Sequence, residues 1–160
     1  MGGNGSYSHF VAKTLGTYVT DRYKQIDKIG QTKVIVVTTQ KNEKQPMNSF
    51  TSSMYYVTAP DHPERITSIT FYDKKTHGIK KSIDLKYDED GNLLEYCTYT
   101  RKGKLHTAGT HVHKWYKKES GDYGRTPHAG DNCFKPTKTD MIYIKRAIRY
   151  NERKAKEKQK

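Results

Sequence analysis

The sequence predicts an α+β protein in which an antiparallel sheet is followed by a basic C-terminal helix. Short runs rich in β-branched and aromatic residues fill the middle of the chain, and one stretch alternates between apolar and polar side chains. Near the end, apolar residues recur at steps of three and four. A length of 160 residues favours one domain, which we place over residues 1–139, with a helix and tail over 140–160.

The N-terminal part is predicted to be irregular and then helical. Residues 1–9 are rich in glycine and serine, which is typical of a flexible start. From Phe10 to Ile29, apolar residues recur at three- and four-residue steps, which favours a helix. Three β-branched or aromatic runs then predict strands at Val34 to Thr39, Met54 to Thr58 and Ile66 to Tyr72.

The stretch from Ile79 to Tyr87 has the clearest alternation in the chain. Its apolar positions include Ile83 and Leu85, and Lys81 is the one exception on that face. Turn-rich segments at residues 73–78 and 88–92 flank it. We therefore expect a meander in which this strand lies between residues 66–72 and residues 93–100.

Residues 101–109 are basic and are predicted to form a loop. A strand from Thr110 to Tyr116 would place His111, His113 and Trp115 on one face and Val112 on the other, because successive side chains in a strand point to opposite faces. Residues 117–139 are punctuated by glycine and proline, which predicts a further loop.

A C-terminal helix is predicted to begin at Asp140. Met141, Ile144 and Ile148 recur at three- and four-residue steps, and Thr139 or Asp140 is placed to cap the helix. Residues 149–160 contain six Lys and Arg against two Glu and no large apolar residue except Tyr150. We expect that end to be a solvated tail.

Positive charge and histidine concentrate in the same part of the sequence. Residues 101–160 contain 17 Lys and Arg against 6 Asp and Glu, whereas residues 1–100 contain 13 against 11. Four of the seven histidines lie between His106 and His128. Imidazole titrates near neutral pH, so this combination indicates acid–base chemistry on a polyanion, for which RNA is the favoured candidate.

Other classes of protein find no support in the sequence. Cys97 and Cys133 are too few for a disulfide scaffold, and no apolar run reaches the length of a membrane-spanning helix. The sequence contains no Walker loop, dinucleotide fingerprint, nucleophile elbow or HExxH motif. We expect a cytoplasmic protein.

The favoured interpretation is metal-independent RNA cleavage. The RNA 2′-hydroxyl is itself the nucleophile, so an enzyme needs a general base, a general acid and cations that stabilise the transition state. The predicted catalytic histidines are His111, His113 and His128. Arg125 and Lys114 are the nearest candidates for holding the phosphate.

A metal site is an alternative interpretation of the same segment. Its candidate ligands are His111, His113 and His128 together with Cys133 or Asp131. Imidazole, thiolate and carboxylate are all ligands that zinc accepts, although the spacing matches no familiar zinc finger. In this case the protein would be a metal-dependent nuclease.

A third interpretation is binding without chemistry. A small sheet with a basic helix can hold nucleic acid through phosphate contacts and base stacking. The predicted contacts are the cations of the C-terminal helix and tail, namely Lys145, Arg146, Arg149, Arg153, Lys154 and Lys156. Such a protein would act as an inhibitor that occludes a nucleic-acid site.

Three segments carry a resemblance to known proteins. The start at residues 1–7, the segment His111-Val112-His113-Lys114-Trp115 and the segment Gly124-Arg125-Thr126-Pro127-His128 look like those of small proteins of bacterial mobile elements. The last hundred residues also resemble the compact basic RNase domains of bacterial toxins. That resemblance implies a toxin restrained by an acidic immunity or antitoxin protein, or an anti-defence factor of the anti-CRISPR type that acts on a host ribonucleoprotein.

Overall fold

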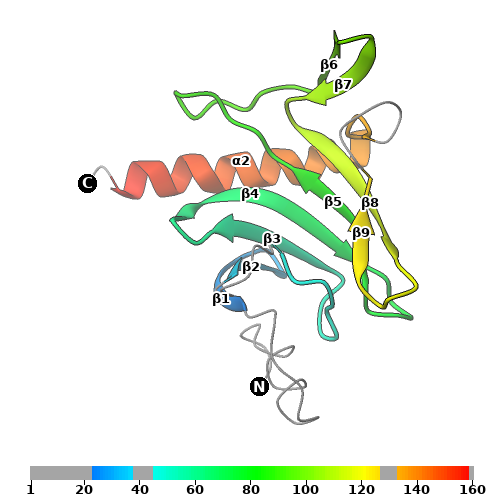
Figure 1. Ribbon diagram of the computed structural model, residues 1–160. Coiled ribbons are helices and arrows are strands. Elements are labelled where there is room, and N and C mark those ends of the chain that lie inside the picture. Colours follow the sequence, from blue (N-terminus) through cyan, green and yellow to red (C-terminus); the bar gives the residue numbers. More distant parts are fainter. Residues whose placement is uncertain (1–22, 38–44, 127–132, 159–160) are drawn as a thin grey trace.

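The computed structural model describes residues 23–37, 45–126 and 133–158 and confirms an α+β fold with a C-terminal helix (Figure 1). Seven strands form one sheet in the order β1-β2-β3-β4-β5-β8-β9, and β6 and β7 form a separate two-stranded hairpin. The elements are β1 Tyr23–Ile29, β2 Thr32–Val37, β3 Met54–Ala59, β4 His62–Tyr72, β5 Ile79–Asp84, β6 Cys97–Arg101, β7 Lys104–Ala108, β8 His111–Lys117, β9 Tyr123–Arg125 and α2 Lys138–Lys158.

Most neighbouring strands run antiparallel, but β2 and β3 are parallel, so the large sheet is mixed. The predicted pairing of residues 66–72 with residues 79–87 is confirmed by β4 and β5. The third strand of the predicted meander was wrong, because β8 and not residues 93–100 lies beside β5. Every residue of β6 is exposed, whereas β8 offers Val112 to the core, and this burial favours β8 at that position.

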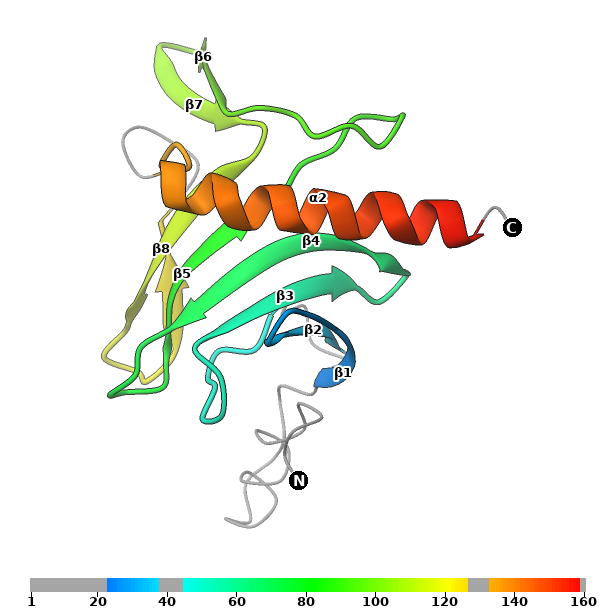
Figure 2. The same ribbon diagram turned by 180° about the vertical axis from the view of Figure 1, so that it is seen from behind.

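The sheet has an apolar cluster on each face. The helix α2 lies across one face, as Figure 2 shows, and its Ile144, Ala147 and Tyr150 pack against β2, β3, β4, β5 and β8. The opposite face carries a second cluster, which contains Tyr23, Ile35, Val37, Tyr55, Val57, Tyr72 and Ile79. Burial on both faces explains why β2 and β3 have nearly continuous apolar sequences instead of an alternating pattern.

The helix α2 begins at Lys138, and its cap is Thr137 instead of the predicted Thr139 or Asp140. The Asp140 backbone N–H donates to Thr137 Oγ1 over 3.1 Å, and the Thr137 N–H donates to Asp140 Oδ2 over 2.9 Å. This reciprocal pair is a capping box with Asp at the third helical position. Asp140 is buried, and Lys81 Nζ pairs with its Oδ1 at 2.5 Å. The pair explains why a lysine interrupts the apolar face of β5.

The C-terminal half of α2 is helical through Lys158 and is anchored to the sheet, whereas the sequence predicted a solvated tail. Asn151 Oδ1 accepts the Ile66 N–H at 2.7 Å, and Asn151 Nδ2 donates to Tyr87 Oη at 2.8 Å. The Tyr87 hydroxyl in turn donates to the Ile66 carbonyl at 2.6 Å. Burial raises the pKa of Tyr87 to about 12 against the opposing effect of the Asn151 hydrogen bond. The described helix is too polar to cross a membrane.

Three further predictions about local structure were wrong. The predicted loop at residues 117–139 contains strand β9. Residues 23–29, which fall in the predicted helix from Phe10 to Ile29, form strand β1, and the rest of that prediction lies outside the described residues. The predicted loop at residues 101–109 contains strand β7 and the turn that joins it to β6. Lys102 and Gly103 have φ angles of 51° and 75°, so both central residues of this turn are left-handed, as a type I′ hairpin turn requires.

The alternation of buried and exposed side chains at the end of β5 leads to a prediction about stability. Replacing the fully buried Ile83 by alanine removes apolar contacts beneath α2, so we expect a loss of about 2–5 kcal/mol in the free energy of unfolding. Lys86 follows the same strand and is exposed, so Lys86→Ala is expected to change the free energy of unfolding by less than about 0.5 kcal/mol. Urea unfolding followed by circular dichroism measures both, and equal losses would contradict the observed orientation of the strand.

Candidate functional site

The histidines of β8 face away from α2. Val112 lies between His111 and His113 and packs into the apolar cluster beneath the helix. Successive side chains of a strand point to opposite faces, so both imidazoles lie on the other face of the sheet, as the sequence predicted. Pairing of β8 with β5 places Asp84 directly opposite His111, and directly opposite residues of antiparallel strands share a face.

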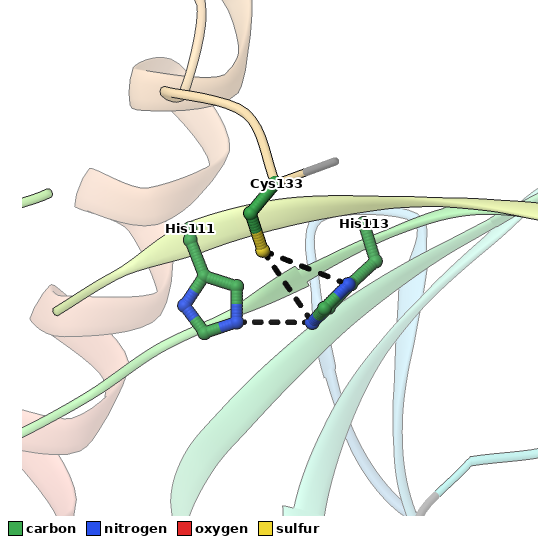
Figure 3. Close-up of side chains that lie close together, drawn as sticks. All are labelled: His111, His113 and Cys133. Carbon is green, nitrogen blue, oxygen red and sulfur yellow. Dashed lines mark hydrogen bonds between the residues drawn. The ribbon is translucent and has the colours of Figure 1, made fainter. Parts of the chain in front are cut away.

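Cys133 reaches the same face from the segment that precedes α2. Val112 and Phe134 form a two-hydrogen-bond bridge, in which each N–H donates to the other's carbonyl. Because this bridge is antiparallel, Cys133, which precedes Phe134, lies opposite His113, which follows Val112. Its Sγ is 3.8 Å from His113 Nδ1 and 4.0 Å from His113 Nε2, and Figure 3 shows the thiol between the two imidazoles.

The hydrogen bonds of the two imidazoles determine which ring nitrogen carries a proton. His111 Nδ1 lies 2.7 Å from the Gly109 carbonyl oxygen, and His113 Nδ1 lies 2.5 Å from the Thr126 carbonyl oxygen. A carbonyl oxygen only accepts, so each Nδ1 carries the donated hydrogen. In the neutral form of either ring, Nε2 therefore has a lone pair. The two Nε2 atoms face one another at 3.0 Å.

Asp84 contributes the negative charge of this group. Its Oδ2 lies 3.5 Å from His111 Nε2, 3.4 Å from His113 Nε2 and 3.3 Å from Arg125 Nη1. Burial alone would raise the pKa of Asp84, but hydrogen bonds and charge from His111 and His113 lower it far below its ordinary value. The carboxylate therefore stays ionised at neutral pH. Burial and the charge of Asp84 raise the pKa of Cys133 to about 11.

The structure brings together some of the predicted site residues and separates others. His111, His113, Arg125 and the alternative ligand Cys133 lie together around Asp84. Lys114 belongs to the face of Val112, where its Nζ lies 4.5 Å from the centre of the Phe134 ring. The predicted residues His128 and Asp131 lie outside the described residues.

Asp84 was missed in the sequence analysis, and its own strand explains why. The alternation of apolar and polar residues in β5 places Asp84 on the polar side of the strand, and this pattern predicts a side that faces water. That side is covered in the folded protein, and the Asp84 side chain keeps only 17 % of its exposure. The contact of Asp84 with the two histidines could be recognised only if the pairing of β8 with β5 were known.

The second candidate site is a row of cations along the outer face of α2. We call the residues Lys138, Lys145, Arg149, Arg153 and Lys156 the basic stripe. They fall within about 80° of one another around the helix, opposite the buried Ala147 and Asn151 side. All five are exposed, and none forms an ion pair within the described part of the chain.

The acids of α2 leave the basic stripe largely uncompensated. Asp140 pairs with Lys81 and Glu157 pairs with Lys154, so Glu152 is the remaining acid of the helix. Among the predicted nucleic-acid contacts, Lys154 differs from the others because its Nζ also lies 3.2 Å from Asp27 Oδ2 on the sheet. Arg146 lies beside the stripe, with its guanidinium over the Tyr143 ring.

The β6–β7 hairpin is a further basic and aromatic surface. It lies above the N-terminal end of α2 in both views (Figures 1 and 2). Arg101, Lys102 and Lys104 form its tip and are exposed. Behind them, Tyr99 stacks on His106, with ring centroids 5.4 Å apart and planes inclined by 21°. Tyr99 remains 46 % exposed, so one face of a stacked aromatic pair is open to a ligand.

Comparisons with protein-family models, curated proteins and solved structures found no match.

The two cysteines are expected to differ sharply in reactivity. Cys133 is 4 % exposed with its pKa raised to about 11, whereas Cys97 is exposed on the hairpin. The thiolate is the reactive form, so iodoacetamide at pH 8 should alkylate Cys97 in the native protein and spare Cys133. In denaturant both should react. Mass spectrometry of the peptides measures this difference, and equal labelling of the native protein would contradict the burial of Cys133.

Proposed function

We propose that the protein binds single-stranded nucleic acid, with RNA favoured, through the basic stripe and the β6–β7 hairpin. The main support for this proposal is the uncompensated positive charge along α2. Against the five cations of the stripe, the described helix has one acid, Glu152, that forms no ion pair. Neutralising phosphates releases condensed counterions, and that release supplies much of the affinity of such surfaces. The net charge of +13 adds long-range attraction for a polyanion.

The dimensions of the stripe suit a nucleic-acid backbone. From Lys138 to Lys156 the helix rises by about 27 Å at 1.5 Å per residue, which corresponds to about eight nucleotides of one strand at 3.4 Å each. Arg149 and Arg153 are one turn apart, or about 6 Å. The hairpin supplies a different type of contact, because the exposed face of Tyr99 offers a stacking platform for an unpaired base.

The position of the imidazoles favours binding over histidine-catalysed cleavage. The side chains of His111 and His113 are 2 % and 0 % exposed, so a bound 2′-hydroxyl does not reach them in this arrangement. They also lie on the face of the sheet opposite α2. A strand of RNA held on the stripe is therefore separated from both imidazoles by the helix and the sheet.

The stripe is tested by removing three of its charges. Replacing Lys145, Arg149 and Lys156 by glutamine removes three phosphate contacts while leaving the buried face of α2 unchanged. At about 0.7 unit per contact, the log–log dependence of affinity on salt should become shallower by about two units. Fluorescence anisotropy with a labelled single-stranded RNA, measured over a range of salt concentrations, gives both the affinity and the slope.

A matched variant controls for the loss of overall charge. Lys74, Lys75 and Lys80 are exposed at the β4–β5 turn, away from α2, and replacing them by glutamine removes the same charge. This variant is expected to bind RNA nearly as the wild type does, with the slope little changed. Equal weakening in the two triple variants would show that the attraction comes from net charge alone, and would contradict a binding site on the stripe.

The hairpin is tested at its aromatic position. Tyr99→Ala should weaken binding of single-stranded RNA by about fivefold or more, because one stacked base contributes about 1–3 kcal/mol. Tyr99→Phe keeps the ring and should bind as the wild type does. The two variants share an exposed site in a separate hairpin, so thermal unfolding should be similar for both. Unchanged affinity in Tyr99→Ala would remove the hairpin from the proposed surface.

Incubation with RNA separates binding from cleavage. With binding alone, total RNA and a defined oligonucleotide stay intact with and without EDTA. Cleavage that persists in EDTA, leaves 2′,3′-cyclic phosphate ends and is lost in His111→Ala or His128→Ala would overturn this part of the proposal and favour the histidine mechanism. EDTA-sensitive cleavage with 5′-phosphate ends would favour a metal-dependent nuclease.

A further inference from the structure

We propose that Asp84, His111, His113 and Cys133 bind one Zn²⁺ ion that joins β5, β8 and the segment preceding α2. The ligand atoms are Asp84 Oδ2, both Nε2 atoms and Cys133 Sγ. This inference is independent of nucleic-acid binding, because the group lies on the face of the sheet away from the basic stripe.

The backbone register delivers four ligands to one place. His111 and His113 are two residues apart on one face of β8, Asp84 lies across the ladder on β5, and Cys133 lies across the opposite edge of β8. Donors from three neighbouring segments thus surround a common point without any change in strand pairing. One ligand atom from each of His111, His113 and Cys133 can be chosen so that the three atoms lie within 4.8 Å of one another.

The histidine hydrogen bonds match those of metal ligands. A metal-bound imidazole usually donates its other ring N–H to a carbonyl or carboxylate, which fixes the tautomer and the ring orientation. Gly109 and Thr126 provide those carbonyl oxygens here. With both rings neutral and protonated on Nδ1, the two Nε2 lone pairs would lie 3.0 Å apart. Two lone pairs at that distance repel unless a proton or a cation lies between them, and Asp84 provides the matching negative charge.

Four of the six distances between the proposed ligand atoms lie within about 0.5 Å of those in a tetrahedral zinc site. Zinc bonds of about 2.0–2.3 Å imply about 3.3–3.6 Å between neighbouring ligand atoms. The distances are 3.0 Å between the Nε2 atoms, 3.5 Å and 3.4 Å from Asp84 Oδ2 to His111 and His113, and 4.0 Å from Cys133 Sγ to His113 Nε2. The longest of these distances is that of the thiol, so metal binding is expected to bring Cys133 Sγ closer to His113 Nε2 by about 0.5 Å.

The donor set selects the metal and its role. A thiolate and two imidazoles disfavour Mg²⁺ and Ca²⁺, which take oxygen ligands, and suit Zn²⁺. The thiolate and the carboxylate balance its two charges. Four protein ligands complete a tetrahedral shell, which is typical of structural zinc sites, whereas a catalytic site keeps one position open. Arg125 holds the Asp84 carboxylate from outside the shell and acts as a positioning residue.

Cobalt titration of the full chain tests the site. After treatment with a chelator and dialysis, the protein should bind a single equivalent of Co²⁺ and develop the visible bands of a tetrahedral site together with a near-ultraviolet thiolate charge-transfer band. Zn²⁺ should displace the cobalt with an apparent Kd of about 10⁻⁸ M or lower. Zn²⁺ should also raise the midpoint of thermal unfolding, because it binds the folded chain preferentially.

The two cysteines provide a matched pair of variants. Cys133→Ser should abolish the charge-transfer band and the thermal stabilisation by Zn²⁺, whereas Cys97→Ser should retain both. Arg125→Gln changes a partly exposed side chain and should weaken Zn²⁺ binding by about 10- to 100-fold while keeping the cobalt spectrum.

Two results would overturn the zinc site. One is a wild-type chain that retains neither Co²⁺ nor Zn²⁺ after desalting, which would show that a shared proton joins the imidazoles. The other is loss of the thiolate band in Cys97→Ser, which would place the metal on the hairpin. Neither measurement requires a variant with an altered buried group, and neither depends on whether RNA binds.

Discussion

The pairing of β5 with β8 is the contact on which the rest of the structure depends. It connects two strands that are separated in sequence by the 88–93 turn and the β6–β7 hairpin. Through this pairing Val112 enters the apolar cluster beneath α2, and Asp84 comes to lie opposite His111. The other edge of β8 then becomes available to β9 and to Phe134. The helix-facing core and the histidine group therefore share one backbone ladder.

The sequence predicted those elements whose local pattern and packing agree. Ile83 and Leu85 alternate with polar residues and are buried as expected, and the two histidines of β8 share the face that alternation assigns to them. The helix was recognised from Ile144 and Ile148, although it begins two residues earlier than expected. In these segments the apolar period and the burial of the strand or helix point to the same structure.

The failures have physical causes that lie outside the local pattern. In β1 the pairing with β2 shifts between Gln25 and Asp27, so the buried Tyr23 and the half-buried Ile29 pack against opposite faces of the sheet. Such a bulge breaks the period of two. The three-residue step from Tyr23 to Ile26 favoured a helix, but Ile26 lies at the bulge and is exposed. The β6–β7 hairpin has little apolar burial to reveal it. Asp84 acquires its role only from β8, a neighbour that no local pattern identifies.

The segment from Cys133 to Asp140 links the two faces of the sheet. Cys133 lies with the histidines on one face, Phe134 pairs with Val112 and packs on the other, and Thr137 and Asp140 form the capping box of α2. Asp140 is tied to Lys81, a residue of the same strand as Asp84. The Asp140 end of this segment is therefore held by β5, and the Cys133 end lies against β8. A metal ion on Cys133 and Asp84 would fix one end and the Lys81 ion pair fixes the other, so the start of α2, and with it the basic stripe, is positioned by the same strand that carries the proposed zinc ligand.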